Sequence, residues 1–311
     1  MFLAASSYAS KVDFAFYFII YTSVILLGLI VGFMLFCVIK YSKKNNPVPT
    51  QIEGHVGLET AWTIGPTIIV MMMFYYGYQG WIDMKTIPDD AMEVKVIGKK
   101  WSWSYEYKFT DNGVEKVKRS GTLVVPVDRN VKLRIESLDV LHSFYIPAFR
   151  MKQDAVPGTP YYMWFRATEV DQKYDVFCAE YCGDSHAYMR SYVEVVSADA
   201  FEEWVRKEPP PEEMGEKLFH EIAACSTCHS IDGSKLIGPS LKGIWERRGK
   251  VVTDGKERSI VADEEYIINS IRYPQKDYAK GYEGVIMTAF DETVLSDEDI
   301  AKIIEYLKTL K

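Results

Sequence analysis

The segment from Cys178 to Met189 carries two thiols, one imidazole and one thioether within a short stretch. Such soft donors suit copper rather than calcium or magnesium, which prefer oxygen ligands. Cys178 and Cys182 are four residues apart, so both sulfur atoms can point at one centre if the segment forms a loop. His186 lies in the same segment, and His142 is the best-placed residue for a second imidazole. The residue types and their spacing therefore predict a copper site.

Three other interpretations of this segment are a disulfide, a zinc site and an unrelated cluster. A disulfide across so short a loop would stabilise little and would not need the His and the Met. Zinc pairs thiolates with imidazoles and rarely uses Met. Mononuclear copper sites of the His2Cys type have one thiolate and a weak axial Met. A second thiolate goes beyond that pattern and allows two copper ions to share both sulfur atoms.

A second short motif, Cys225–His229, reads Cys-Ser-Thr-Cys-His. This CxxCH pattern is typical of covalent haem attachment, in which both thiols bond the haem vinyl groups and the adjacent imidazole binds the iron. Met287 lies in an irregular stretch between two expected helices and is the candidate for the sixth ligand. The rivals Met214 and His220 are too close to the motif to reach the opposite haem face. A His/Met ligand pair closes the iron to substrates and indicates electron transfer.

Two uncharged apolar segments predict a membrane hairpin, residues 14–39 and residues 60–82. Each exceeds the roughly 20 residues that a helix needs to cross a bilayer. The first is too long for a cleavable signal, and no cleavage site follows it. Lys40, Lys43 and Lys44 in the connecting loop place that loop in the cytoplasm, so both Cys pairs lie on the outer face of a bacterial cytoplasmic membrane. A hairpin that serves only as an anchor is the alternative.

The chain of 311 residues has room for two or three domains. Short alternating strands are expected between residues 89 and 207, which is typical of a β-sandwich or Greek-key barrel, with the copper loop between its last two strands. The three consecutive prolines in the segment 208–214 predict a stiff linker. Residues 215–311 are expected to be helical, with helices at 263–272 and 296–310. The expected strands are 93–97, 122–127, 131–136, 161–166, 173–177 and 191–196, followed by a short helix at 199–207.

Charge and cysteine usage exclude several classes of function. The net charge of -7 makes nucleic acid an unsuitable partner. The five Cys comprise two tight pairs and Cys37 in an apolar segment, which is the pattern of a metalloprotein and not of a disulfide scaffold. From Glu212 onward, 19 Asp and Glu stand against 14 Lys and Arg, which favours an electron donor with a basic docking surface.

These features together resemble subunit II of haem-copper cytochrome c oxidases, in the caa3 version with a fused C-terminal cytochrome c. The resemblance covers essentially the whole chain. It depends on the CxExCGxxHxxM loop, the upstream His142 in a Leu-His-Ser-Phe segment, the aromatic run from Trp101 to Tyr107 and the two N-terminal apolar segments. It implies a cupredoxin-like barrel followed by a class I cytochrome c domain.

In that family the loop holds the binuclear copper centre CuA. The resemblance therefore implies that Cys178 and Cys182 bridge two coppers. His142 and His186 would be terminal ligands, Met189 a weak ligand and Glu180 a ligand through its backbone carbonyl. The Glu180 side chain would face a magnesium site shared with subunit I.

Two further roles are implied by the resemblance. Trp101 matches the tryptophan through which electrons enter, although packing is an equal alternative because a fused haem can deliver the electrons here. Glu59 matches a carboxylate at the mouth of a proton channel in subunit I, and its alternative is a solvated residue at a helix end. Val156–Thr159 lacks the Arg that many relatives have after Pro-Gly, which puts a contact with subunit I in doubt.

The implied function is electron input to a terminal respiratory oxidase. A donor such as a cytochrome c or another respiratory complex would reduce haem c, then CuA, and then a haem in subunit I, where oxygen reduction and proton pumping occur. The chain has no acid/base pair or nucleophile triad, so it is expected to be an enzyme only in complex with subunit I and subunit III. Alternatives are the input subunit of a CuA-type nitric oxide reductase and a freestanding membrane-anchored electron carrier. A quinol oxidase subunit II is disfavoured because those lack the copper ligands.

Overall fold

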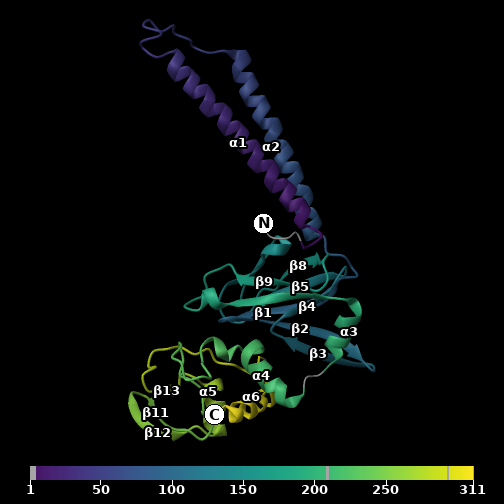
Figure 1. Ribbon diagram of the computed structural model, residues 1–311, viewed down its shortest axis with the longest axis vertical. Coiled ribbons are helices and arrows are strands. Elements are labelled where there is room, and N and C mark those ends of the chain that lie inside the picture. Colours follow the sequence, from purple (N-terminus) through teal and green to yellow (C-terminus); the bar gives the residue numbers. More distant parts are fainter. Residues whose placement is uncertain (1–4, 208–209, 293, 311) are drawn as a thin grey trace.

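The chain forms three successive parts in a computed structural model that describes residues 5–207, 210–292 and 294–310. Figure 1 shows a long helical hairpin standing on a β-domain, and a smaller C-terminal domain on the opposite side of that β-domain. The hairpin consists of α1 (Ala9–Lys40) and α2 (Val56–Lys85). Both are long and apolar enough to cross a membrane, and their side chains are exposed.

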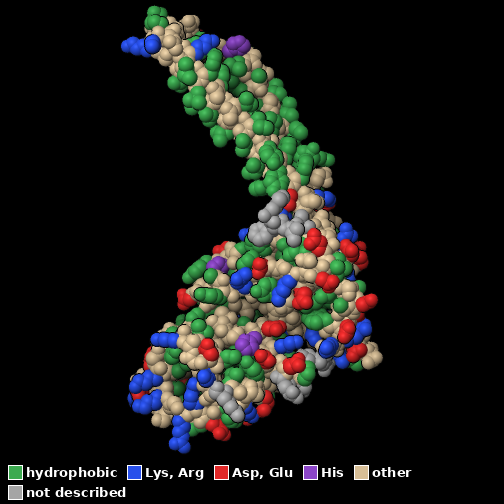
Figure 2. All heavy atoms as spheres, viewed as in Figure 1, with side chains coloured by type: hydrophobic (Ala, Val, Ile, Leu, Met, Phe, Trp, Pro, Cys, Tyr) green, Lys and Arg blue, Asp and Glu red, His purple; other side chains and the backbone are tan. Residues whose placement is uncertain are grey.

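Helix α1 begins five residues before and ends one residue after the predicted limits of 14–39, and α2 extends four and three residues beyond 60–82. The prediction stopped at charged residues, namely Asp13, Lys40, Glu59 and Asp83, and the helices continue through them. Figure 2 shows apolar side chains over the hairpin surface, with Lys and Arg gathered at its tip and near its base. The tip loop lies far from the β-domain, so the fold keeps the Lys-rich loop and the extramembrane domains at opposite ends of the hairpin (Figure 1).

The base of the hairpin is joined to the β-domain by polar contacts. The Arg150 guanidinium binds the Asp13 carboxylate through two hydrogen bonds of 2.7 and 3.0 Å. The Trp164 indole donates to the backbone carbonyl of Asp83 over 3.2 Å, and Lys11 forms an ion pair with the Asp83 side chain. These contacts fix the direction in which the helices leave the domain.

The β-domain is a sandwich of two five-stranded sheets, ordered β3-β2-β1-β5-β8 and β4-β10-β9-β6-β7. Successive side chains of a strand point to opposite faces of its sheet, so every second residue faces the other sheet. In β5, Val131, Leu133 and Ile135 are buried and the residues between them are less so. The first sheet contains β1 (Met92–Lys99), β2 (Ser102–Asp111), β3 (Val114–Ser120), β5 (Asn130–Ser137) and β8 (Tyr161–Arg166). The second contains β4 (Leu123–Pro126), β6 (His142–Ile146), β7 (Met151–Ala155), β9 (Gln172–Cys178) and β10 (Arg190–Val196).

Helix α3 (Ala198–Arg206) closes this cupredoxin-like domain, close to the expected helix at 199–207. All six expected strands are present, with ends that differ by one or two residues. Strands β2, β3, β6 and β7 were not expected. Two parallel pairs, β1 with β5 and β4 with β10, join an otherwise antiparallel arrangement.

The C-terminal domain contains α4 (Pro211–Lys217), α5 (Glu264–Arg272) and α6 (Asp297–Thr309). Helix α6 begins with a capping box between Ser296 and Asp299. Where α4 crosses α6, a Cβ on Gly215 would lie 2.1 Å from the Lys302 carbonyl oxygen, so only glycine permits this close approach. A three-stranded sheet of β12 (Lys256–Val261), β11 (Arg248–Thr253) and β13 (Tyr278–Ala279) was not expected in this mainly helical domain.

The predicted linker 208–214 lies partly outside the described residues, because 208 and 209 are not described. The prediction of an extended spacer is wrong for its second half, since α4 begins at Pro211. Proline is tolerated there because the first N–H groups of a helix have no partner within the helix.

Candidate copper and haem centres

The sheet topology brings the predicted copper ligands together. The loop from Cys178 to Met189 joins β9 to β10, which are neighbours in the second sheet, so the expectation that it connects the last two strands is confirmed. His142 is the first residue of β6, and β6 pairs with β9 so that Phe144 faces Cys178. A candidate ligand 36 residues upstream therefore reaches the end of the loop.

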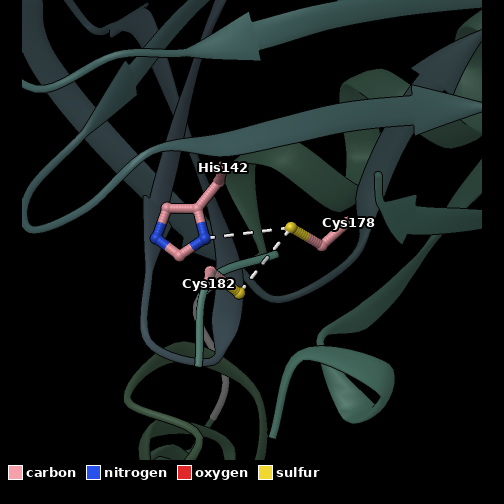
Figure 3. A group of neighbouring side chains, drawn as sticks. All are labelled: His142, Cys178 and Cys182. Carbon is pink, nitrogen blue, oxygen red and sulfur yellow. Dashed lines mark hydrogen bonds between the residues drawn. The ribbon is translucent and has the colours of Figure 1, made fainter. Parts of the chain in front are cut away.

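The donor atoms form one contiguous cluster. Figure 3 shows the His142 ring and the two thiols turned toward one another. The Cys178 and Cys182 Sγ atoms are 3.8 Å apart, and His142 Nδ1 lies 3.8 Å from the Cys178 sulfur. The Cys182 sulfur lies 3.6 Å from His186 Nδ1 and 3.8 Å from the Met189 sulfur. The backbone oxygen of Glu180 is 3.2 Å from the Cys178 sulfur.

The His142 ring is fully buried and is oriented by a carboxylate. Its Nε2 lies 2.8 Å from Asp139 Oδ1, and because an ionised carboxylate can only accept, Nε2 donates. The Nδ1 lone pair is then directed to the Cys178 sulfur. Burial alone would lower the His142 pKa, but the hydrogen bonds with Asp139 and Cys178 outweigh it and raise that pKa. Carboxylates that orient a ligand imidazole in this way also strengthen metal binding.

The two thiols differ in acidity. Burial opposes ionisation of Cys178, but hydrogen bonding with His142 and with backbone groups lowers its pKa to about 7. Burial and the adjacent Cys178 raise the Cys182 pKa to about 12. One thiolate thus forms readily and the second needs a compensating cation, which a bound metal supplies.

The donor set fits copper and does not fit a disulfide, calcium or magnesium. A sulfur separation of 3.8 Å is far from the disulfide bond length of about 2.05 Å. Calcium and magnesium would require several oxygen ligands, whereas this cluster offers two thiols, two imidazoles, a thioether and one carbonyl. Each sulfur has an imidazole on its own side, an arrangement that two metal ions sharing both thiolates can use.

The haem motif opens into a cavity of about 270 Å³ that is lined mainly by apolar side chains. Cys225 and Cys228 lie in and beside a single 3-10 turn, and they border this cavity together with His229 and Met287. Burial raises the pKa of both thiols. The motif and the candidate sixth ligand thus border one cavity, as attachment and axial binding of a haem require.

His229 is held by the turn that follows the motif. Its Nδ1 donates to the Pro239 carbonyl over 2.8 Å, which leaves the Nε2 lone pair for a metal. Burial lowers the pKa of His229 and favours this neutral form. A Cβ on Gly238 would lie 2.6 Å from His229 Cε1, so the turn packs directly on the ring.

The two rivals of Met287 are absent from the lining of this cavity among the residues that the structure describes. His220 lies 3.0 Å from the Tyr306 hydroxyl through its Nε2, and Met214 packs against the domain core. Met287 remains the candidate sixth ligand.

Trp101 contacts both centres. It borders the haem cavity, and its indole N–H donates to the Cys182 carbonyl over 3.2 Å. Its ring also packs on Gly183, where a Cβ would lie 3.1 Å from Trp101 Cζ2. The side chain therefore occupies the space between the copper loop and the haem cavity.

Glu59 lies at the tip end of α2 and has a local structural role. Its carboxylate accepts the backbone N–H of His55 over 3.0 Å, while His55 Nδ1 accepts the N–H of Leu58 over 3.1 Å. These two reciprocal hydrogen bonds cap the start of α2, and they account for the position of the Glu59 side chain by contacts inside this chain. The Glu180 side chain is exposed at the copper loop.

Asp139 and Lys99 are the functional candidates that the sequence analysis missed. The signal for Asp139 was a carboxylate three residues before a candidate metal ligand. No local signal existed for Lys99, whose partners are 190 residues away in the chain.

Three family profiles match the chain, and each matches one of the three parts described above. They are the transmembrane domain of cytochrome c oxidase subunit II over residues 1–79, its periplasmic domain over residues 109–196, and cytochrome c over residues 212–311. Cytochrome c oxidase subunit 2 of Alkalihalophilus pseudofirmus is 31% identical, over 93% of this chain and 85% of that protein. Cytochrome c oxidase subunit 2 of Cereibacter sphaeroides is 31% identical over 56% of this chain and 68% of that protein.

Among solved structures, the crystal structure of the periplasmic domain of subunit II of cytochrome oxidase of Bradyrhizobium japonicum is similar to part of this chain. The match has 33% identity, covers 39% of this chain and 94% of that chain, and has a TM-score of 0.34.

Proposed function

Because this chain belongs to the cytochrome c oxidase subunit II family, in a form with a fused cytochrome c domain, we propose that it is the electron-input subunit of a terminal respiratory oxidase. In this proposal the chain would hold haem c and binuclear CuA, which would carry electrons from a donor to a haem in subunit I, where oxygen reduction would be coupled to proton pumping. When bound, these two groups supply one-electron carriers. The observation that carries the proposal is the position of Trp101, which is hydrogen-bonded to the backbone of Cys182 and borders the haem cavity.

The residues of the chain have distinct tasks in this proposal. Cys178 and Cys182 would hold the copper centre together with His142, His186, Met189 and the Glu180 carbonyl. Cys225 and Cys228 would attach the haem, and His229 and Met287 would bind its iron. Asp139 and the Pro239 carbonyl each fix the tautomer of one imidazole, so the ligand nitrogens need little rearrangement. A rigid β-domain limits ligand movement during electron transfer.

Trp101 connects the copper loop with the haem cavity. Its indole is hydrogen-bonded to the backbone of a copper ligand and borders the haem cavity, so electrons from the fused haem need not cross solvent. An internal donor of this kind leaves the outer surface of the cytochrome domain for the external donor, either a cytochrome c or another respiratory complex.

The membrane hairpin supports association with subunit I and with subunit III in a bacterial cytoplasmic membrane. The Lys-rich tip favours a cytoplasmic loop, which puts both redox domains on the outer face. At that face the exposed Glu180 carboxylate is available for a magnesium ion shared with subunit I. Glu59, at the cytoplasmic end of α2, is available to subunit I as a proton-channel residue in addition to capping its helix.

Replacing Cys182 by Ser in the purified oxidase tests this function. We expect the mixed-valence copper signal in electron paramagnetic resonance to disappear, while the donor still reduces haem c. Oxygen consumption should fall by more than about 100-fold, since even the loss of a group that only supports a ligand costs 10–100-fold. The matched control is Cys37→Ser, because Cys37 is a free thiol in α1 remote from the loop.

A retained copper signal in Cys182→Ser would contradict the binuclear assignment. Turnover of nitric oxide but not of oxygen by the wild-type complex would assign the chain to a nitric oxide reductase. A protein that purifies alone in mild detergent, without haem a-type absorbance, would be a freestanding carrier.

A further inference from the structure

Lys99 is a buried lysine at the end of β1, with 7% of its surface exposed. Its ammonium group donates to the Ala289 carbonyl over 2.8 Å and lies 3.3 Å from the centroid of the Phe290 ring. A buried ammonium group is costly unless such partners compensate for lost water. Both partners belong to the cytochrome domain, so a charged side chain of the β-domain is embedded in its neighbour.

The segment that Lys99 binds follows the haem-ligand candidate Met287 directly. Phe290 is buried in the core of the cytochrome domain, its N–H donates to the Ile271 carbonyl over 3.2 Å, and its carbonyl accepts from Arg272 over 2.8 Å. The segment is therefore fixed on one side by its own domain and on the other by Lys99.

On the copper side, the residue after Lys99 is hydrogen-bonded to the carboxylate that orients His142. The N–H of Lys100 donates to Asp139 Oδ2 over 2.8 Å, and the other oxygen of Asp139 binds His142. Burial lowers the pKa of Lys99 to about 8, against the opposing effect of the Asp139 and Asp291 carboxylates. Trp101, two residues further, borders the haem cavity.

Other contacts between the two domains involve β3 and the turn that follows it. Arg119 binds Asp299 over 3.1 Å, and a Cβ on Gly121 would lie 2.5 Å from the Glu221 side chain. These contacts join β3 and its following turn to the helices of the cytochrome domain. They fix the domains at one edge, whereas Lys99 acts where the Met287 segment meets the Trp101 segment.

We propose that Lys99 is a positioning residue for electron transfer between the two domains: its ammonium group holds the segment 288–290 on β1 and so keeps the haem cavity in register with Trp101. The inference rests on the proposed function and adds to it the residue that sets the geometry between the centres. A lysine suits this task because its three N–H donors can bind a carbonyl while the charge lies on an aromatic face.

The test uses the complete purified oxidase with three variants of this subunit. Lys99→Met keeps the length and apolar stem of the side chain but removes the charge. Lys99→Arg keeps the charge and the donors. Lys95→Met is the control, since Lys95 lies on the same strand and pairs with Glu136 within the β-domain over 3.4 Å.

Photoreduction of the haem, followed by the rise of reduced copper, gives the rate between the centres. We expect Lys99→Met to slow this rate at least about tenfold, because the rate falls with the population of the docked arrangement. Lys99→Arg should stay within about threefold of wild type and Lys95→Met should match it. Hydrogen exchange of the backbone amides in segment 288–292 should become faster in Lys99→Met alone.

Unchanged transfer and unchanged exchange in Lys99→Met would overturn the inference. Slow transfer accompanied by loss of the sulfur-to-iron band or of the copper signal would also overturn it, since Lys99 would then support a centre and not the geometry between centres. The proposed function fails separately, if the wild-type complex itself shows no transfer from haem to copper.

Discussion

His142 and His229 each donate one ring N–H to a fixed oxygen acceptor. The acceptors are the carboxylate of Asp139 and the carbonyl of Pro239, both at 2.8 Å. In each ring the other nitrogen is left with its lone pair for a metal. The choice of nitrogen follows from the acceptor, because neither a carboxylate nor a carbonyl can donate a proton to the ring.

Asp139→Asn should weaken copper binding by about 10–100-fold. Asp139 accepts from the His142 ring, from the Lys100 N–H and from the Val140 N–H. An amide has a single oxygen, so one of these donors would face an NH2 group. Copper retention during competition with a chelator measures the effect.

The matched control is Asp184→Asn, which removes a carboxylate from the exposed part of the same loop. Equal copper retention in Asp139→Asn and wild type would mean that the carboxylate does not support the ligand.

At the scale of elements, most residues of the candidate site could be predicted from short sequence motifs. The copper and haem motifs each place several donors within one loop, so spacing alone brought them together. His142 required knowledge of the sheet, because β6 must pair with β9 before it reaches the loop. The roles of these residues as ligands remain predictions.

The burial pattern explains only part of which strands were expected, because β2 alternates and was missed, whereas β4 is buried throughout and was expected. In β5 buried and less buried residues alternate, and this pattern is visible in the sequence. Strand β6 is buried at nearly every position, and β3 is a mostly exposed strand at the sheet edge, so neither has such alternation along its whole length. The β11–β12 hairpin did carry a signal, the Asp254–Gly255 turn, in which both residues have positive φ.

Gly238→Ala tests the turn that supports the haem-ligand candidate His229. The new Cβ would lie 2.6 Å from Cε1 and 2.8 Å from Nδ1 of His229, so the ring must move. Overpacking of this kind costs about 1–3 kcal/mol. We expect a lower haem potential and a fraction of high-spin haem, measured by redox titration and absorption spectroscopy.

Gly249→Ala is the control for this substitution. Gly249 also borders the cavity, but its Cβ would make only an ordinary contact of 3.7 Å with Ile260. A Gly238→Ala protein with the wild-type potential and spectrum would show that the turn does not orient the imidazole.

At the scale of the whole molecule, the contacts that join the two redox domains could not be predicted. Lys99 and Ala289 are 190 residues apart, and Arg119 and Asp299 are 180 apart. Pairing at such separation depends on the shapes of two finished domains and leaves no periodic pattern in the sequence. The three-part architecture was predictable, because each part has its own periodicity and composition.

In the proposed function, the docked arrangement would make the cytochrome domain the internal donor of the copper loop. Trp101 lies between the haem cavity and Cys182, and Lys99 binds the segment after Met287. Electrons that reach the haem are therefore expected to arrive at copper without release of any carrier.

Stopped-flow reduction of the oxidized complex by its donor tests this order most directly, with the haem c band and the near-infrared copper band recorded together. The account predicts that the haem band changes first and that the copper band follows it at a rate independent of donor concentration. Reduction of copper before haem, or at a rate proportional to donor concentration while the haem stays oxidized, would contradict it.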